Sequence, residues 1–127
     1  MALTNFTGLH INTKEPVYIQ IARYVKRMIL CDQIKDTEKL PSRRELAMTL
    51  GVNPNTVQKA FKLMEEEGYV LTEGNLASKI RIDPDIYRKI EEEMTHGLVK
   101  EFVQEAKRNN LSFQKVVALL SDIWDSA

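Results

Sequence analysis

The sequence predicts a mainly α-helical fold with one small β-hairpin, and three features point to it. Two short amphipathic helices are predicted at 43–50 and 54–67, with a glycine between them. Two β-leaning runs follow at 69–72 and 78–82, joined by a turn that contains glycine and asparagine. In the last segment, 83–127, apolar residues recur at helical spacing. A helix pair, a hairpin and a helical tail together indicate a winged helix-turn-helix followed by a two-helix C-terminal segment.

Capping residues fix the bounds of the two paired helices. Ser42 and Glu45 form a capping box at the start of the first helix. Asn53 and Pro54 supply an N-cap and a first-turn proline for the second. Gly51 lies in the turn, where a residue without Cβ takes a positive φ at little cost. The predicted packing positions of the pair are Leu46, Ala47, Leu50, Val52, Val57, Ala60, Phe61 and Met64.

A third helix is predicted upstream, beginning at Pro16 and ending at about Cys31. Cys31 is the only cysteine, and we expect its thiol to be buried near the end of an apolar helix. Residues 32–39 are predicted to form a polar loop, and residues 1–15 an N-terminal arm to which the sequence assigns no task. The winged helix-turn-helix domain is therefore predicted to span 16–82.

The C-terminal segment, 83–127, carries more apolar surface than two helices can bury between them. One helix is predicted from Pro84 to about Arg108, and Ser112 can cap a second. The apolar positions of the two are Ile86, Ile90, Met94, Leu98, Phe102, Phe113, Val116, Val117, Leu119, Leu120, Ile123 and Trp124. We expect a second copy of the chain to cover this surface, which makes the segment a predicted dimerisation segment.

The polar face of the second paired helix makes double-stranded DNA the leading partner. Its side chains are amides, a hydroxyl and two ammonium groups, which suit base edges and phosphates. Carboxylates are absent from its first turn, although the helix dipole would favour them there. The alternative interpretation is a purely structural helix pair in which the asparagines only cap. The polar-face residues are Asn55, Thr56, Gln58, Lys59 and Lys62.

The formal net charge is zero, but the charges are not evenly spread. Residues 1–82 hold 12 Lys and Arg against 9 Asp and Glu, whereas 83–127 hold 6 against 9. Phosphate binding needs a local basic surface rather than a basic protein. The basic excess therefore lies in the half that contains the predicted helix-turn-helix.

Several function classes are not expected. No apolar run approaches the roughly 20 residues that span a bilayer, and no export leader opens the chain, so we expect no membrane partner and a cytoplasmic location. His10 and His96 have no carboxylate or thiol at ligand spacing, so no metal site is expected. The sequence has no Gly-rich phosphate loop, no nucleophile with a base at motif spacing and no paired acids. We expect neither enzyme activity nor a cofactor.

Residues 16–82 resemble the GntR family of bacterial transcription regulators. The resemblance is carried by Leu-Pro-Ser-Arg-Arg-Glu-Leu-Ala, Leu-Gly-Val-Asn-Pro-Asn-Thr-Val and Glu-Glu-Gly-Tyr-Val. The opening Pro-Val-Tyr-Ile-Gln-Ile and the Asn-Pro-Asn-Thr-Val turn are similar to the YtrA subfamily, which has a short two-helix C-terminal region. The resemblance implies a homodimeric repressor that binds an inverted-repeat operator.

The resemblance implies DNA contacts at the start of both paired helices and at the wing tip. With the neighbouring basic residues, the candidate DNA-binding set is Ser42, Arg43, Arg44, Asn53, Asn55, Thr56, Gln58, Lys59, Lys62 and Gly74. The wing departs from the Gly-x-Gly tip that is usual in the family. It lacks the second glycine and places Glu73 near the expected phosphates. The resemblance therefore does not extend to a strong minor-groove contact by this wing.

Two alternative functions stay open at this point. The first is a small-ligand-sensing module with an unknown effector bound between subunits, because a tail of about 45 residues cannot alone enclose a pocket of several hundred Å³. The second is an adaptor whose winged helix binds protein. A titration of DNA binding against salt separates them, since contacts to phosphate weaken steeply as salt rises.

Overall fold

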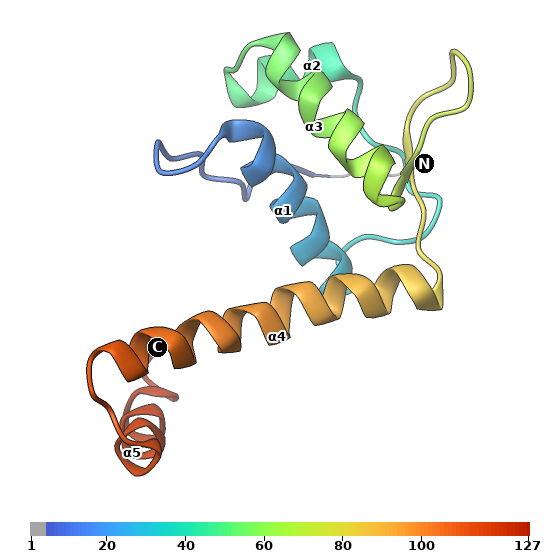
Figure 1. Cartoon of the computed structure of the whole chain (residues 1–127). Helices are drawn as coiled ribbons and strands as arrows, with labels where there is room; N and C mark the ends of the chain where they lie inside the picture. The colour runs from blue at the N-terminus through green and yellow to red at the C-terminus, as the bar shows by residue number, and fades with distance from the viewer. Residues whose placement is uncertain (1–4) are drawn as a thin grey trace. The chain divides into compact units, whose positions relative to one another are not determined.

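The computed structural model describes residues 5–127, and within them it contains five helices and one two-stranded sheet (Figure 1). The elements are α1 (Val17–Leu30), α2 (Arg43–Leu50), α3 (Pro54–Glu67), β1 (Val70–Leu71), β2 (Lys79–Ile80), α4 (Pro84–Arg108) and α5 (Phe113–Ile123). The predicted fold class is confirmed. The contacts divide the chain into a winged unit that ends at Ile90 and a C-terminal unit, Glu91–Ala127.

The predicted caps set the starts of α2 and α3. Ser42 Oγ accepts a hydrogen bond from the backbone N–H of Glu45, and the Glu45 carboxylate accepts one from the N–H of Ser42, both at 3.1 Å. These hydrogen bonds, first the one to the Ser42 side chain, lower the pKa of Glu45 below its ordinary value. Asn53 Oδ1 accepts from the N–H of Asn55 at 2.8 Å, and Gly51 takes a φ of +67°. The sharp turn between α2 and α3 follows from these contacts.

Helix α3 packs on both α1 and α2 and forms the centre of the winged unit. Its apolar face is fully buried, with Val57, Ala60 and Met64 showing no exposed surface. Two ion pairs reinforce the contacts: Lys26 Nζ of α1 lies 3.1 Å from Glu67, and the Arg43 guanidinium of α2 lies 3.3 Å from Glu65. Part of the acidic run at the end of α3 therefore holds its neighbours in place.

The wing is shorter in its paired part than the sequence predicted. Strands β1 and β2 pair antiparallel, with Val70 opposite Ile80, over two residues each rather than over 69–72 and 78–82. The end of the predicted polar loop 32–39 pairs with the β2 segment and so extends the sheet beyond β2. The N–H of Thr37 donates to the carbonyl of Ile80 at 2.8 Å, and the N–H of Leu40 donates to that of Ser78 at 2.9 Å.

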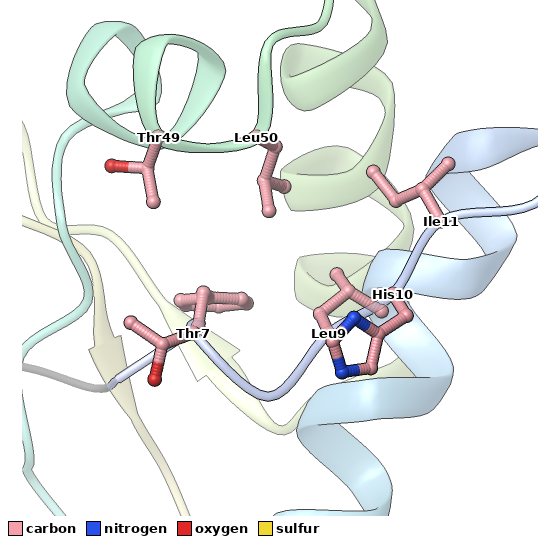
Figure 2. A pocket seen from close by; sticks show the side chains of 7 residues that line it. Thr7, Leu9, His10, Ile11, Thr49 and Leu50 are labelled. Atoms are coloured by element: carbon pink, nitrogen blue, oxygen red, sulfur yellow. The ribbon is translucent and has the colours of Figure 1, made fainter.

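Residues 5–15 of the predicted N-terminal arm pack against α1. Phe6 is buried, and its ring centroid lies 5.5 Å from that of Tyr24. The Gln20 side chain hydrogen-bonds both the N–H and the carbonyl of Asn12, at 3.0 and 2.9 Å. An open hollow of about 500 Å³ lies between the arm, at Thr7 to Ile11, and the end of α2 (Figure 2). Residues 5–15 are thus a folded part of the winged unit.

The prediction of a buried Cys31 was wrong. Helix α1 ends at Leu30, and Cys31 is its C-cap, with an exposed side chain. Asp32 follows with a φ of +55°, so the chain turns away from the helix at this point. The apolar face of α1 ends with Met28 and Ile29, both buried, and Cys31 lies beyond it.

The C-terminal unit leaves most of its apolar surface exposed. Ile86 and Ile90, at the start of α4, are buried within the winged unit. Beyond them Ala106 is buried, and α5 has no buried residue at all. The exposed fractions reach 79% at Phe113 and 76% at Trp124. No helix between residues 5 and 127 has the length and apolar character needed to cross a membrane.

Candidate nucleic-acid interface

The exposed stripe of α3 is the centre of the candidate site. Asn55, Gln58, Lys59 and Lys62 are all exposed, and Thr56 is half-buried beside them. Positions three, four and seven apart share one face of a helix, so the amides and ammonium groups lie in one row. The first turn of α3 carries no acidic residue. The row can therefore face polyanionic DNA, with the partly positive N-terminus of the helix directed at the DNA.

Two candidate residues use their side-chain oxygens to cap helices. Ser42 Oγ accepts from Glu45, and Asn53 Oδ1 accepts from Asn55. These atoms fix where α2 and α3 begin, and so they aim the side chains that follow. The amide NH₂ group of Asn53 is the part of that side chain left to donate to DNA.

The two candidate arginines at the start of α2 have different surroundings. The Arg43 guanidinium lies 4.5 Å from the centroid of the Phe61 ring and pairs with Glu65. Arg44 is exposed. Consecutive helical residues point about 100° apart, since the helix has 3.6 residues per turn. The structure thus gives Arg43 a packing role and leaves Arg44 as the better placed of the two for DNA.

The Lys59 ammonium is held by a residue that the sequence analysis did not single out. Its Nζ lies 5.3 Å from the centroid of the Tyr18 ring, which comes from the first turn of α1. Such a cation–π contact restrains a long side chain that would otherwise be mobile. The tyrosine in the Pro-Val-Tyr opening was the available signal, but its partner could not be found without the packing of α1 on α3.

The wing tip is an exposed turn that starts from a charged residue. Gly74 adopts a φ of +55°, and the N–H of Leu76 donates to the carbonyl of Glu73 at 3.0 Å. Glu73 Oε1 lies 3.8 Å from Lys79 Nζ. The expected carboxylate is therefore present at the wing, and a lysine partly balances it.

The comparison with known families decides the class of this protein. The model of the family described as "Bacterial regulatory proteins, gntR family" matches residues 17–80. The chain belongs to the GntR family. This GntR-family chain is accordingly a DNA-binding transcription regulator, with a function in binding rather than in catalysis.

Relatives and solved structures agree with this assignment. An uncharacterised helix-turn-helix regulator, YhcF of Bacillus subtilis, is 29% identical over 105 residues, which cover 83% of this chain and 87% of YhcF. The repressor YtrA of the same organism is 47% identical over 57 residues, which are 45% of this chain and 44% of YtrA. A GntR family regulator from Listeria monocytogenes superposes with a TM-score of 0.81 at 27% identity, over 88% of this chain and 98% of that one.

Proposed function

We propose that this protein is a homodimeric repressor that binds an inverted-repeat DNA operator through α3. The observation that carries the proposal is the exposed row Asn55, Gln58, Lys59 and Lys62, which starts at a helix end without acidic residues. A helix of this kind fits the major groove, where its N-terminal residues contact base edges.

The side chains of the site divide by chemistry. Asn55 and Gln58 carry amides that can hydrogen-bond adenine in pairs, so they determine sequence preference, with Thr56 beside them. Lys59 and Lys62 contact phosphates and set general affinity. Arg44 contacts a guanine or a phosphate. The remaining candidate residues position other groups. Ser42 and Asn53 cap the two helices and so set their direction. Arg43 fixes α2 on α3, and Gly74 allows the turn of the wing.

The exposed apolar face of the C-terminal unit supports a homodimer. Four residues of α5 and the C-cap residue that follows it are each 44% exposed or more, namely Phe113, Val117, Leu120, Ile123 and Trp124. A second copy with the same face covers both faces at once, as a two-fold symmetric interface requires. Two recognition helices related by a two-fold axis match two half-sites in opposite orientation, and the operator is then an inverted repeat.

The repressor role has support from a relative. YtrA of Bacillus subtilis is called a transcriptional repressor, and its 57-residue match to this chain is 47% identical. A dimer bound over a promoter excludes the polymerase by occupying its site. We extend this role to the present chain on that basis.

Selection of duplexes from a random pool by the full-length protein tests the proposal. Enrichment of one sequence arranged as an inverted repeat is the expected result, with affinity that falls steeply between 50 and 200 mM salt as about 6 to 10 phosphate contacts demand. Placed downstream of a promoter, the enriched sequence should reduce reporter expression when the protein is present. No enrichment, or a rise in expression, would overturn the DNA specificity or the repressor role respectively.

A second candidate function is the sensing of a small apolar effector. A hollow of about 380 Å³ lies between α4 and α5 within the C-terminal unit. Apolar side chains line it, namely Phe102, Leu111, Val116, Leu119, Leu120, Ile123, Trp124 and Ala127. A polarity-sensitive dye such as ANS distinguishes the cases. Dye binding by the dimer favours an effector site at this hollow, whereas its absence favours a hollow that the partner chain fills.

A further inference from the structure

Two lysines stand directly opposite each other at the base of the wing. Lys39 and Lys79 form an antiparallel bridge pair. Their neighbours Leu40 and Ile80 are buried, so the alternation of side chains places both lysines on the outer face of the sheet. Like charges at directly opposite positions destabilise a sheet. The two ammonium groups on this face therefore repel each other, and an anion that contacts both lowers that repulsion.

The space beside this pair can accept such an anion. A hollow of about 160 Å³ is lined by Lys39, Glu73, Leu76, Ala77 and Lys79. Two of these side chains are cationic and one is anionic. A phosphate oxygen is the anion that a DNA-binding protein meets most often.

One wall of the hollow, Lys39, lies in the segment that leads directly into the start of α2. The N–H of Leu40 donates to the carbonyl of Ser78, and Ser42, the N-cap of α2, follows two residues later. Lys39 therefore belongs to the segment that leads into Arg44, and the backbone hydrogen bond of Leu40 joins that segment to the strand of Lys79. The ribbon between β1 and β2 projects on the side of the winged unit where α2 begins (Figure 1).

Glu73 reaches into the same hollow and pairs with one of the lysines. Its Oε1 lies 3.8 Å from Lys79 Nζ, with the two side chains 59% and 41% exposed. An ion pair at such exposure is weak, so a phosphate can displace the carboxylate. The carboxylate also repels the phosphate that replaces it.

We propose that Lys39 and Lys79 bind one phosphate of the operator backbone and that Glu73 competes with that phosphate. The inference rests on the proposed function, because it requires DNA against the start of α2. A backbone contact carries no sequence information. Glu73 therefore lowers affinity for all sequences alike, and a larger share of the remaining affinity comes from the base contacts of α3.

The test measures DNA affinity for full-length Lys39→Gln, Lys79→Gln and Glu73→Gln proteins by fluorescence anisotropy. The probes are the duplex enriched by the wild type and a mixed-sequence duplex of equal length. Because the two lysines share one phosphate, each lysine variant should lose part of the roughly 0.9 that one phosphate contact adds to the salt slope, and its loss of affinity between 50 and 200 mM salt should be up to about 3.5-fold smaller than that of the wild type. Glu73→Gln should bind both duplexes more tightly by about 1.5- to 5-fold, the effect of an exposed ion pair.

The signs of the effects separate this inference from a merely structural ion pair. If Glu73 and Lys79 only clamp the ribbon, either substitution breaks the clamp and both change affinity in the same direction. The proposal requires opposite directions, and it also requires that Lys79→Arg retain the wild-type salt slope. Effects of the same sign, or unchanged slopes in both lysine variants, would overturn it.

Matched controls lie on α4 in the C-terminal unit. Lys100→Gln and Glu101→Gln remove the same charges at exposed positions, and they should change affinity less than the wing variants. The lysine variants should melt at or slightly above the wild-type temperature, because each substitution removes the repulsion between Lys39 and Lys79. If the wild type enriches no duplex, the proposed function fails. If it does and the lysine variants match their controls, only this inference fails.

Discussion

At the scale of single residues, Arg43 and Arg44 show how neighbouring side chains of one type acquire different tasks. The sequence placed both at the start of a capped helix, and that was enough to name both as candidates. Their difference depends on Phe61 and Glu65, which belong to another helix and meet Arg43 only after folding. The pattern of one helix could not decide between them.

Replacing Arg44 with Ala should weaken operator binding and leave stability unchanged. The loss should be about 1–3 kcal/mol if the guanidinium contacts a base in bidentate fashion. Arg43→Ala is the matched control, and it should instead destabilise the fold by about 1 kcal/mol through loss of the contact to Phe61 and the pair with Glu65. Anisotropy titrations and thermal melts of both variants check this. A lower melting temperature for Arg44→Ala would assign it a structural role.

Gln58→Ala should change which sequence the protein prefers. Gln58 is exposed one turn into α3, where its amide can bond adenine in the major groove. Lys62→Ala, one turn further on, should lower affinity for every sequence and reduce the salt slope by about 0.9. Parallel selections from one random pool measure both effects. An identical enriched sequence for wild type and Gln58→Ala would show that this side chain contacts no base.

At the scale of elements, local signals in the sequence were enough to predict the helices. Features that depend on pairing between distant segments were not predicted. The bounds of α2 and α3 followed from Ser42, Asn53 and Pro54, whose effects act within one turn. The third segment of the sheet was missed because residues 37–40, which pair with the β2 segment, are separated from it by about 40 residues in the sequence. The exposure of Cys31 was missed because α1 ends one residue earlier than predicted.

Gly68→Ala should destabilise the winged unit, whereas Gly97→Ala should not. Gly68 ends α3 with a φ of +93°, and an added Cβ would lie 3.2 Å from Ile86 Cδ1. A left-handed conformation costs an L-residue about 1–2 kcal/mol. Gly97 lies inside α4 with no atom within 4 Å of an added Cβ, so alanine should stabilise the helix by up to about 1 kcal/mol. Urea unfolding of both variants measures the difference, and equal losses would refute the conformational explanation.

At the scale of the whole molecule, the winged unit buries its apolar residues and the C-terminal unit does not. The sequence predicted that the tail needs a cover, and the exposed side chains of α5 agree with that need. It could not show that Ile86 and Ile90 already pack within the winged unit while Leu98, at the same spacing, is 67% exposed. Equal spacing along one helix does not reveal where the packing of a domain ends.

The proposed dimer should dissociate when charge is placed in the exposed apolar face of α5. Val117 and Leu120 are 44% and 45% exposed and lie one turn apart, so Val117→Glu with Leu120→Glu should not unfold the chain. Full burial of a large apolar side chain contributes about 1.5–3 kcal/mol, and less than half of each of these two side chains remains to be buried, so the double variant should raise the dimer Kd by at least about 10-fold. Gln114→Glu with Ala118→Glu adds the same charge to the polar side of α5 and should leave the dimer intact.

Sedimentation velocity at micromolar concentration distinguishes dimer from monomer. The dissociated variant should also lose its preference for an inverted repeat over a single half-site, since one recognition helix contacts one half-site. A wild type that sediments as a monomer, or a double variant that stays dimeric, would place the interface elsewhere or remove it altogether.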